Sequence, residues 1–225
     1  MKKQTKVKIA LPDGSLREAT LDILKSAGLN ISRKERAYTL TVENNEAFEC
    51  MLVKPQEAGR FVERGLFDAG VTGMDWVTET RSRVKTLAEF PYSKSSMKPT
   101  KLVLAVPASS PVKELRDLKG KIIATEFVAI TEAYLRKNGV AAIVEFSWGA
   151  TESKALYFSD AIVDIVDTGN SLAANGLRPF ATVFESNVGL VANELALADI
   201  GKATAIGEFI SLLKVGYENT LSSRA

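Results

Sequence analysis

Apolar and polar residues along the chain recur with the two periods of regular secondary structure, and the first segments alternate strand with helix. Residues 6–11 form a short, mostly apolar run that ends at the turn-forming residues 12–14. In residues 16–27 the apolar positions recur every three or four residues, which places them on one face of a helix. This opening β–turn–α unit predicts an α/β fold.

Similar units fill the rest of the chain, and a polar segment separates them into two groups. Residues 93–99 are rich in serine and lysine and end at Pro99, a composition typical of a domain crossover. We therefore predict lobe I from residues 1–91 with 181–225, and lobe II from residues 92–180. Further strands are predicted at 37–42, 48–53, 66–73, 101–106, 122–125, 142–146, 161–166, 180–185 and 188–192, and further helices at 54–64, 111–118, 131–138 and 203–213.

Composition narrows the class of protein. With 225 residues, 46% of them hydrophobic, the chain is long enough for a substantial core. The net charge of +2 indicates no nucleic-acid surface. No apolar run approaches the roughly 20 residues of a membrane span, and the N-terminal residues do not resemble a signal peptide. We expect a cytoplasmic protein that binds neither nucleic acid nor membrane.

The chain has no histidine. This absence excludes catalytic triads that use an imidazole base and zinc sites that use imidazole ligands. Any bound metal must then be held mainly by oxygen atoms, which favours Mg²⁺ or Ca²⁺ over Zn²⁺. Reactions that depend on positioning and charge stabilisation, without a protein nucleophile, remain open.

The segment from Asp160 to Leu177 carries the strongest chemical signal. Residues 161–166 are almost wholly apolar and predict a buried strand, and the polar loop 167–171 separates it from a short helix. Backbone N–H groups at such a helix start suit a phosphate. The carboxylates of Asp164 and Asp167 suit sugar hydroxyls or Mg²⁺. The loop therefore predicts a sugar-phosphate site, although an ordinary strand–turn–helix junction has the same general pattern.

The residues of this segment, D-A-I-V-D-I-V-D-T-G-N-S-L-A-A-N-G-L, resemble the phosphoribosyl-pyrophosphate loop of the ATP phosphoribosyltransferase family. Three more segments resemble the same family: A-L-P-D-G-S-L-R-E-A-T at 10–20, D-A-G-V-T-G-M-D-W at 68–76 and V-E-F-S-W-G-A-T-E at 144–152. The resemblance extends to about residue 193. It implies an enzyme that transfers the phosphoribosyl group from phosphoribosyl pyrophosphate to N1 of ATP, the first step of histidine biosynthesis.

The resemblance also implies a fold, a site and a metal. The fold is that of type II periplasmic binding proteins, with two lobes, a hinge and an interlobe cleft. The metal is Mg²⁺ bound with the pyrophosphate, with no dedicated metal site in the protein. Residues expected to bind phosphoribosyl pyrophosphate are Asp164, Asp167, Thr168, Gly169, Asn170 and Ser171, the two aspartates also being the expected catalytic groups. Residues expected near ATP are Leu11, Asp13, Gly14, Ser15, Gly73 and Asp75.

The chain resembles the short catalytic form of the family, although a truncated long form is an alternative. Short forms pair with a paralogue of histidyl-tRNA synthetase that does not charge tRNA. The resemblance thus implies such a regulatory partner, together with a homo-oligomer of this chain.

The basic residues that the family pattern predicts are missing at three places. Asp13 stands where lysine is usual, and neither residues 132–133 nor Ala173 is basic. Each lost charge-assisted contact to a phosphate costs about 1.5–3 kcal/mol. A catalytically weakened paralogue that acts as a ligand-binding or regulatory subunit is therefore the alternative function. The transferase hypothesis requires compensation from a partner or from Arg17, Lys54, Lys154 or Arg178.

Overall fold

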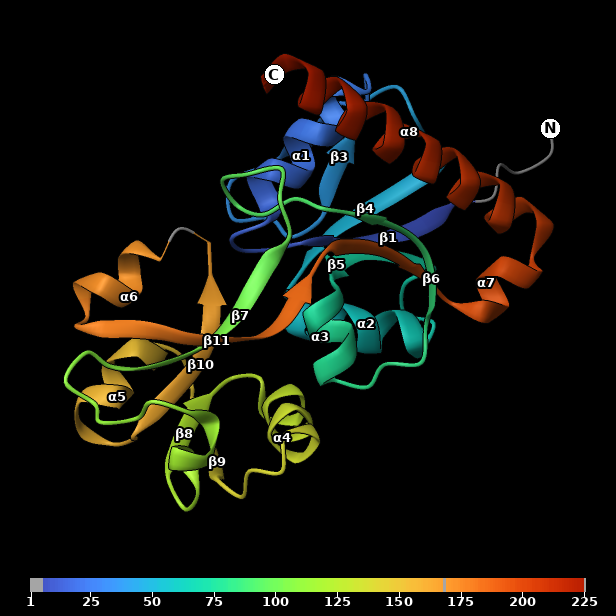
Figure 1. Cartoon of the computed structure of the whole chain (residues 1–225). Coiled ribbons are helices and arrows are strands. Elements are labelled where there is room, and N and C mark those ends of the chain that lie inside the picture. The colour runs from blue at the N-terminus through green and yellow to red at the C-terminus, as the bar shows by residue number, and fades with distance from the viewer. Residues whose placement is uncertain (1–5, 168, 225) are drawn as a thin grey trace. The chain divides into compact units, whose positions relative to one another are not determined.

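The computed structural model describes residues 6–167 and 169–224. The chain forms two compact units, each with its own five-stranded sheet (Figure 1). Unit 1 comprises Met1–Pro99 and Asn187–Ala225, and unit 2 comprises Thr100–Ser186. The predicted boundaries after residues 91 and 180 differ from these bounds. The second would cut one continuous strand, Leu177–Ser186, which pairs with the first strand of unit 2 as far as Thr100.

Unit 1 is built around a mixed sheet with strand order β4-β1-β5-β12-β6. Its elements are β1 (Val7–Pro12), α1 (Arg17–Ser26), β2 (Ile31–Arg33), β3 (Leu40–Val42), β4 (Phe48–Val53), α2 (Pro55–Glu63), β5 (Ala69–Gly73), α3 (Met74–Glu79), β6 (Lys85–Phe90), β12 (Val188–Ala192), α7 (Glu194–Ala198) and α8 (Ile200–Arg224). Strands β2 and β3 form a separate two-stranded sheet.

The parallel strands of unit 1 align three helix starts at one edge of the sheet. β1 runs parallel to both β4 and β5, and Pro12 at the end of β1 is in register with Val53 at the end of β4. Helices α1, α2 and α3 follow these strands after short turns or none. Their N-termini, which carry the positive ends of the helix dipoles, therefore lie at the carboxyl edge of the sheet.

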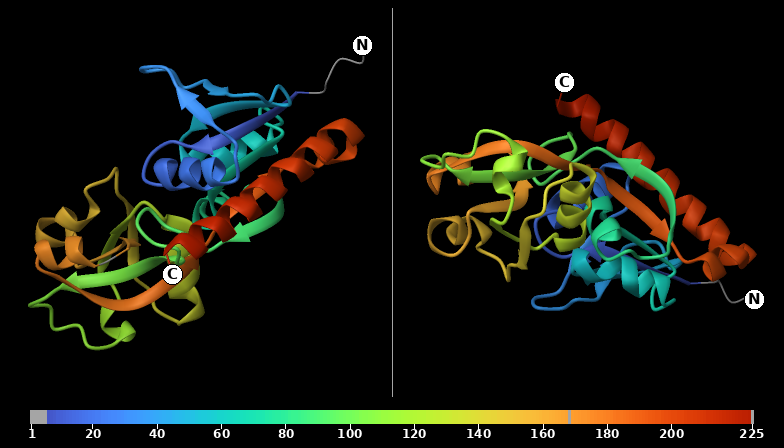
Figure 2. Two further views of the ribbon diagram at one scale, coloured as in Figure 1. Left: turned by 90° about the horizontal axis from the view of Figure 1, so that it is seen from above. Right: turned by 60° about the horizontal axis from the view of Figure 1, so that its bottom comes forward.

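The core of unit 1 lies between this sheet and helices α1 and α8. Phe48 of β4 packs edge-on against Phe209 of α8, with ring centroids 5.2 Å apart. α8 runs beside α1 (Figure 2), and at Gly216 a Cβ atom would lie 1.9 Å from the carbonyl oxygen of Ile23. Glycine is therefore required for this close approach of the two helices. No helix in residues 6–167 and 169–224 is long and apolar enough to cross a membrane.

Unit 2 is also built around a mixed five-stranded sheet, with strand order β11-β7-β10-β8-β9. Its elements are β7 (Thr100–Pro107), the 3₁₀ turn η1 (Leu115–Leu118), β8 (Ile122–Thr125), α4 (Val128–Lys137), β9 (Ile143–Phe146), α5 (Thr151–Tyr157), β10 (Ala161–Val166), α6 (Asn170–Ala174) and β11 (Leu177–Ser186). β8 is parallel to β9 and β10, so helices α4, α5 and α6 start at one carboxyl edge.

The predicted helix at 111–118 is wrong. Only Leu115–Leu118 forms a helical turn, and it is a 3₁₀ turn preceded by a capping box between Glu114 and Asp117. The Asp117 carboxylate accepts hydrogen bonds from the backbone N–H groups of Lys113 and Glu114. These side-chain hydrogen bonds hold the preceding segment in a turn and start the helix late.

Candidate functional site

A short loop joins β10 to α6 (Figure 1), and its glycine, Gly169, has a distinctive backbone conformation. Gly169 has a φ of 79°, in the left-handed region that favours glycine, and it caps α6. Among the described residues beyond its chain neighbours, a Cβ atom there would have Val166 Cγ1 as its nearest contact, 4.0 Å away. There is room for a side chain at this position. Glycine is therefore favoured by the backbone conformation and not by close packing. Asp167 and Asn170 are exposed beside it, and Thr168 lies outside the described residues.

Asp164 lies on β10 just before this loop and is mostly shielded from solvent. Its Oδ1 accepts a hydrogen bond of 2.7 Å from the backbone N–H of Ile165. The pKa of Asp164 is raised to about 6: burial raises it most, the hydrogen bond from Ile165 lowers it, and the negative charges of Glu152 and Glu126 add to the rise. The Asp164 carboxylate is thus a poorly solvated anion, which a nearby positive charge would stabilise.

Ser171, which the sequence predicts as a phosphate ligand, contacts an acidic side chain. Its hydroxyl donates a hydrogen bond of 2.8 Å to Glu152 Oε1. Glu152 lies in the first turn of α5, whose start shares the sheet edge with the loop. Neither Glu152 nor Glu126 was predicted as a site residue, although Glu152 ends the family-like segment V-E-F-S-W-G-A-T-E. The carboxylates of Asp164, Glu152 and Glu126 therefore all influence the end of β10 and the loop that follows it.

Asp13 at the carboxyl edge of unit 1 holds two cations. Its Oδ2 lies 3.1 Å from Lys54 Nζ and its Oδ1 lies 3.2 Å from Arg17 Nη1. The hydrogen bond from Lys54 lowers the pKa of Asp13; burial opposes this, and the charges of Lys54, Arg17 and Arg33 add to it. The sequence suggests that Asp13 would repel a phosphate, but in the structure its charge is neutralised by its neighbours.

The turn around Asp13 differs in part from expectation. Ser15 and Glu18 have the spacing of a capping box, but α1 begins at Arg17 without a side-chain cap, and Glu18 accepts a hydrogen bond from Arg17 Nε. Gly14, with φ at 128°, has open space around it, and Ser15 is exposed. The Leu11 side chain packs in the core. If Leu11 contacts a ligand, it therefore does so through its backbone and not through its side chain.

Gly73 and Asp75 form a closely packed pair where β5 passes into α3. A Cβ atom on Gly73 would lie 2.1 Å from Asp75 Oδ1, so the Asp75 carboxylate would have to move to admit a side chain. Asp75 is buried, and its Oδ1 accepts a hydrogen bond from the backbone N–H of Trp76 at 2.8 Å. Glycine at 73 thus makes room for the Asp75 carboxylate at the start of α3.

Comparison with known proteins decides the family. A model of the family described as ATP phosphoribosyltransferase (HisG) matches residues 54–214. ATP phosphoribosyltransferase from Chlorobaculum parvum is 47% identical over 208 residues, which cover 92% of this chain and 70% of the relative. The protein of that name from Chlorobium luteolum is 48% identical over 208 residues, again 92% and 70%. This chain belongs to the ATP phosphoribosyltransferase family.

Solved structures confirm the predicted fold of this family member. The ATP phosphoribosyl transferase (HisG:HisZ) complex from Thermotoga maritima gives a TM-score of 0.77 at 25% identity, covering 94% of this chain and 98% of that chain. The periplasmic aliphatic sulphonate binding protein SsuA from Escherichia coli gives 0.65 at 16% identity, covering 99% and 76%. The second likeness shows the fold alone, and it supports the predicted resemblance to periplasmic binding proteins.

Two of the four cations expected to compensate for the missing basic residues of the family pattern lie at a predicted site. Arg17 and Lys54 both contact Asp13. Arg178 Nη2 instead donates to the backbone carbonyls of Ser110 and Val112, so its role is structural. Lys154 lies on α5 and forms no ion pair within the part of the chain that the structure describes. Of the four cations, Arg17 and Lys54 are therefore the two that lie at the predicted ATP site, where both contact Asp13.

The described residues contain no preformed metal site. Over residues 6–167 and 169–224, no group of three or more His, Cys, Asp and Glu side chains is arranged to hold a metal ion. Asp164 and Asp167 supply carboxylate oxygens at the loop, a ligand type that Mg²⁺ prefers. Mg²⁺ bound with the pyrophosphate therefore stays a prediction.

Proposed function

We propose that this chain transfers the 5-phosphoribosyl group from phosphoribosyl pyrophosphate to N1 of ATP, giving phosphoribosyl-ATP and pyrophosphate in the first step of histidine biosynthesis. In this reaction N1 of the adenine forms a bond to C1 of the ribose while the bond from C1 to the pyrophosphate oxygen breaks. The observation that carries the proposal is the loop after β10, where the half-buried carboxylate of Asp164 precedes a glycine in the left-handed region.

The loop suits the phosphoribosyl group. Residues 168–171 would receive the 5′-phosphate, because the backbone around Gly169 is open and a side chain there would obstruct the ligand. Positive charge develops on the ribose as pyrophosphate leaves. The poorly solvated carboxylate of Asp164 would be stabilised by that charge, and the transition state by the carboxylate. Asp167, exposed at the strand end, would accept hydrogen bonds from the ribose hydroxyl groups.

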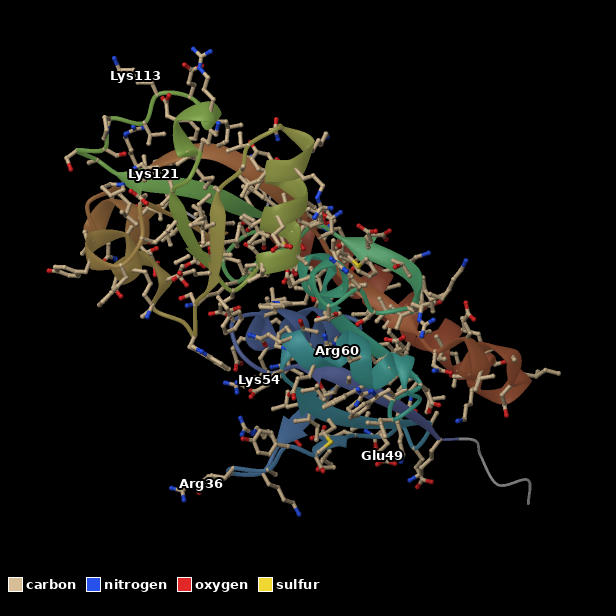
Figure 3. The ribbon with its side chains drawn as sticks, turned by 90° about the horizontal axis from the view of Figure 1, so that it is seen from below. Arg36, Glu49, Lys54, Arg60, Lys113 and Lys121 are labelled. Carbon is tan, nitrogen blue, oxygen red and sulfur yellow. The ribbon has the colours of Figure 1, made fainter. Side chains whose placement is uncertain are left out.

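The carboxyl edge of unit 1 suits the triphosphate of ATP. The N-termini of α1, α2 and α3 lie along it, and Arg17 and Lys54 add two cations. Figure 3 shows Lys54 and Arg36 at the same end of the unit. Gly73 and Asp75 lie one strand away in this edge, where Asp75 would face the less anionic parts of the nucleotide.

Mg²⁺, a cytoplasmic location and a protein partner belong to the same proposal. When bound, Mg²⁺ would offset the charge of the leaving pyrophosphate, whose oxygens would supply most of its ligands. The Thermotoga maritima protein is in a complex of HisG with HisZ. A HisZ-like regulatory subunit is accordingly the partner we propose for this chain.

The alternative function is a ligand-binding or regulatory subunit that has lost the chemistry, and the aspartate at position 13 favours it. One assay separates the two functions: the chain is incubated with ATP, phosphoribosyl pyrophosphate and Mg²⁺, with and without the partner, while the ultraviolet absorbance of phosphoribosyl-ATP is followed. Product formation supports the transferase. Binding of both substrates by calorimetry without product, even with the partner, would support the binding subunit.

A further inference from the structure

We propose that Asp13 is a positioning residue that holds Lys54 and Arg17 in place for the triphosphate of ATP. The inference rests on the proposed function, since it concerns how the same chain binds ATP. Asp13 stands where the family pattern has a basic residue. On this proposal, its carboxylate does not only remove a positive charge: it also orders the two cations, Lys54 and Arg17, that take the place of that basic residue.

The Asp13 carboxylate is more shielded from solvent than the two cations that contact it. Each Asp13 oxygen contacts a different cation, at 3.1 Å for Lys54 and 3.2 Å for Arg17. The Asp13 side chain is only 14% exposed, whereas those of Lys54 and Arg17 are 58% and 31% exposed. An ammonium group has three N–H donors. Lys54 can therefore keep its contact with Asp13 and still donate to an anion on its exposed side.

The backbone fixes this arrangement independently of the side chains. The N–H of Asp13 donates to the carbonyl of Val53 at 2.8 Å, which makes Asp13 and Lys54 neighbours across the ends of two parallel strands. Arg17 follows four residues after Asp13, at the first position of α1. Lys54 is the N-cap residue of α2, where Pro55 fixes the first helical position. Both cations therefore stand at helix N-termini.

The charges around Asp13 nearly balance. Arg17, Lys54 and Arg33 act on the Asp13 carboxylate, the last of them from β2. The carboxylates of Glu18 and Glu57 lie in the first turns of α1 and α2, close in sequence to Arg17 and Lys54. Affinity for an anion therefore depends on where the cations are held and not on a net positive charge.

Two roles for Asp13 predict opposite signs for the same substitution. If the carboxylate only repels the triphosphate, Asp13→Asn should tighten ATP binding, because one negative charge is lost. If the carboxylate positions Lys54 and Arg17, Asp13→Asn should weaken ATP binding although the site becomes more positive. Asp13→Glu keeps the charge but moves it by one methylene group. A positioning role therefore predicts weaker binding for this variant as well.

The experiment measures ATP affinity by titration calorimetry and initial rates on the full chain, with the regulatory partner present. We expect Asp13→Asn and Asp13→Glu to raise the Kd for ATP at least fivefold, with phosphoribosyl-pyrophosphate affinity unchanged. Glu49→Gln is the control, since it removes an exposed carboxylate near the start of β4, away from the carboxyl edge, and should change ATP affinity less than twofold.

Adding Lys54→Met tests the coupling directly. In that background Asp13→Asn should have less than half its effect, because the cation that Asp13 holds is gone. Tighter or unchanged ATP binding by a folded Asp13→Asn, together with wild-type affinity of Asp13→Glu, would overturn the positioning role. Failure of the wild-type chain to bind ATP would instead overturn the proposed function, so the two failures are distinguishable.

Discussion

The Ser171 hydroxyl donates a hydrogen bond of 2.8 Å to Glu152 Oε1, which joins the loop after β10 to the first turn of α5. A carboxylate thus contacts a residue that the family resemblance assigns to phosphate binding. The hydrogen bond orders the loop, while the negative charge of Glu152 opposes the arrival of a phosphate. These two effects can be separated because glutamine keeps the hydrogen-bond acceptor and loses the charge.

Glu152→Gln should tighten phosphoribosyl-pyrophosphate binding several-fold, because one repelling charge is removed while the contact to Ser171 is kept. Ser171→Ala should weaken binding instead, since it removes a hydroxyl donor next to the phosphate. Calorimetry on both variants checks these signs. Glu145→Gln, which neutralises an exposed carboxylate on β9, is the control and should leave the affinity unchanged. Equal effects of Glu152→Gln and Glu145→Gln would remove Glu152 from the site.

Asp164→Asn should stabilise the folded protein at neutral pH. The pKa of Asp164 is raised from 3.8 to about 6, so the folded state binds this proton more tightly than the unfolded chain does. The stabilisation that this protonation gives is fully present below pH 3.8 and is lost as pH rises through about 6. The variant should therefore exceed wild type by roughly 2 kcal/mol at pH 7 and lose that advantage near pH 4. Urea unfolding at several pH values measures it. A constant difference across this range would contradict the expectation.

Turnover should respond to Asp164 in the opposite direction. Asp164→Asn should lower kcat on the order of 10²-fold, more than it weakens phosphoribosyl-pyrophosphate binding, because the carboxylate acts mainly on the charge of the transition state. Asp167→Asn should have a smaller effect that appears mainly in substrate affinity. The wild-type rate should also fall as pH drops below about 6, where Asp164 is protonated. Wild-type turnover in both variants would exclude a catalytic role for either aspartate.

Gly169→Val should abolish phosphoribosyl-pyrophosphate binding while the fold survives. The substitution strains a backbone with φ at 79° and places a branched side chain in open space at the loop. Gly120→Val is a matched control in the same unit, with φ at 74° and nothing within 4 Å of its Cβ position. Both variants should lose similar stability by thermal unfolding, and only Gly169→Val should lose the ligand. Unchanged calorimetric binding by a folded Gly169→Val would remove the loop from the site.

Gly73→Ala should destabilise unit 1 by roughly 1–3 kcal/mol, because its Cβ atom would meet the buried Asp75 carboxylate. In an Asp75→Ala background the same substitution should cost much less, since the obstructing atoms are absent. Denaturant unfolding of the two single variants and the double variant measures this coupling. Additive losses would show that the two residues do not share the space the structure assigns them.

The sequence alone determined the α/β class, most strands and the position of the loop after β10. These features depend on local information: the period of the apolar residues, and glycines and turn residues between them. The family membership was also predictable, because the segment from Asp160 to Leu177 is long and specific. Local competition explains the main error, the side-chain hydrogen bonds of Asp117 that hold a turn in place of the predicted helix.

Only the tertiary structure decided which charges meet. Asp13 and Lys54 are far apart in the sequence, and the register of β1 with β4 makes them an ion pair. In the same way, the packing of α5 beside β10 gives Ser171 a contact with Glu152 and raises the pKa of Asp164. A sequence shows the sign of each charge, but burial and the neighbours that strand pairing supplies set its effect. For that reason the aspartate at position 13, a mismatch in the sequence, becomes the centre of a cationic cluster in the folded protein.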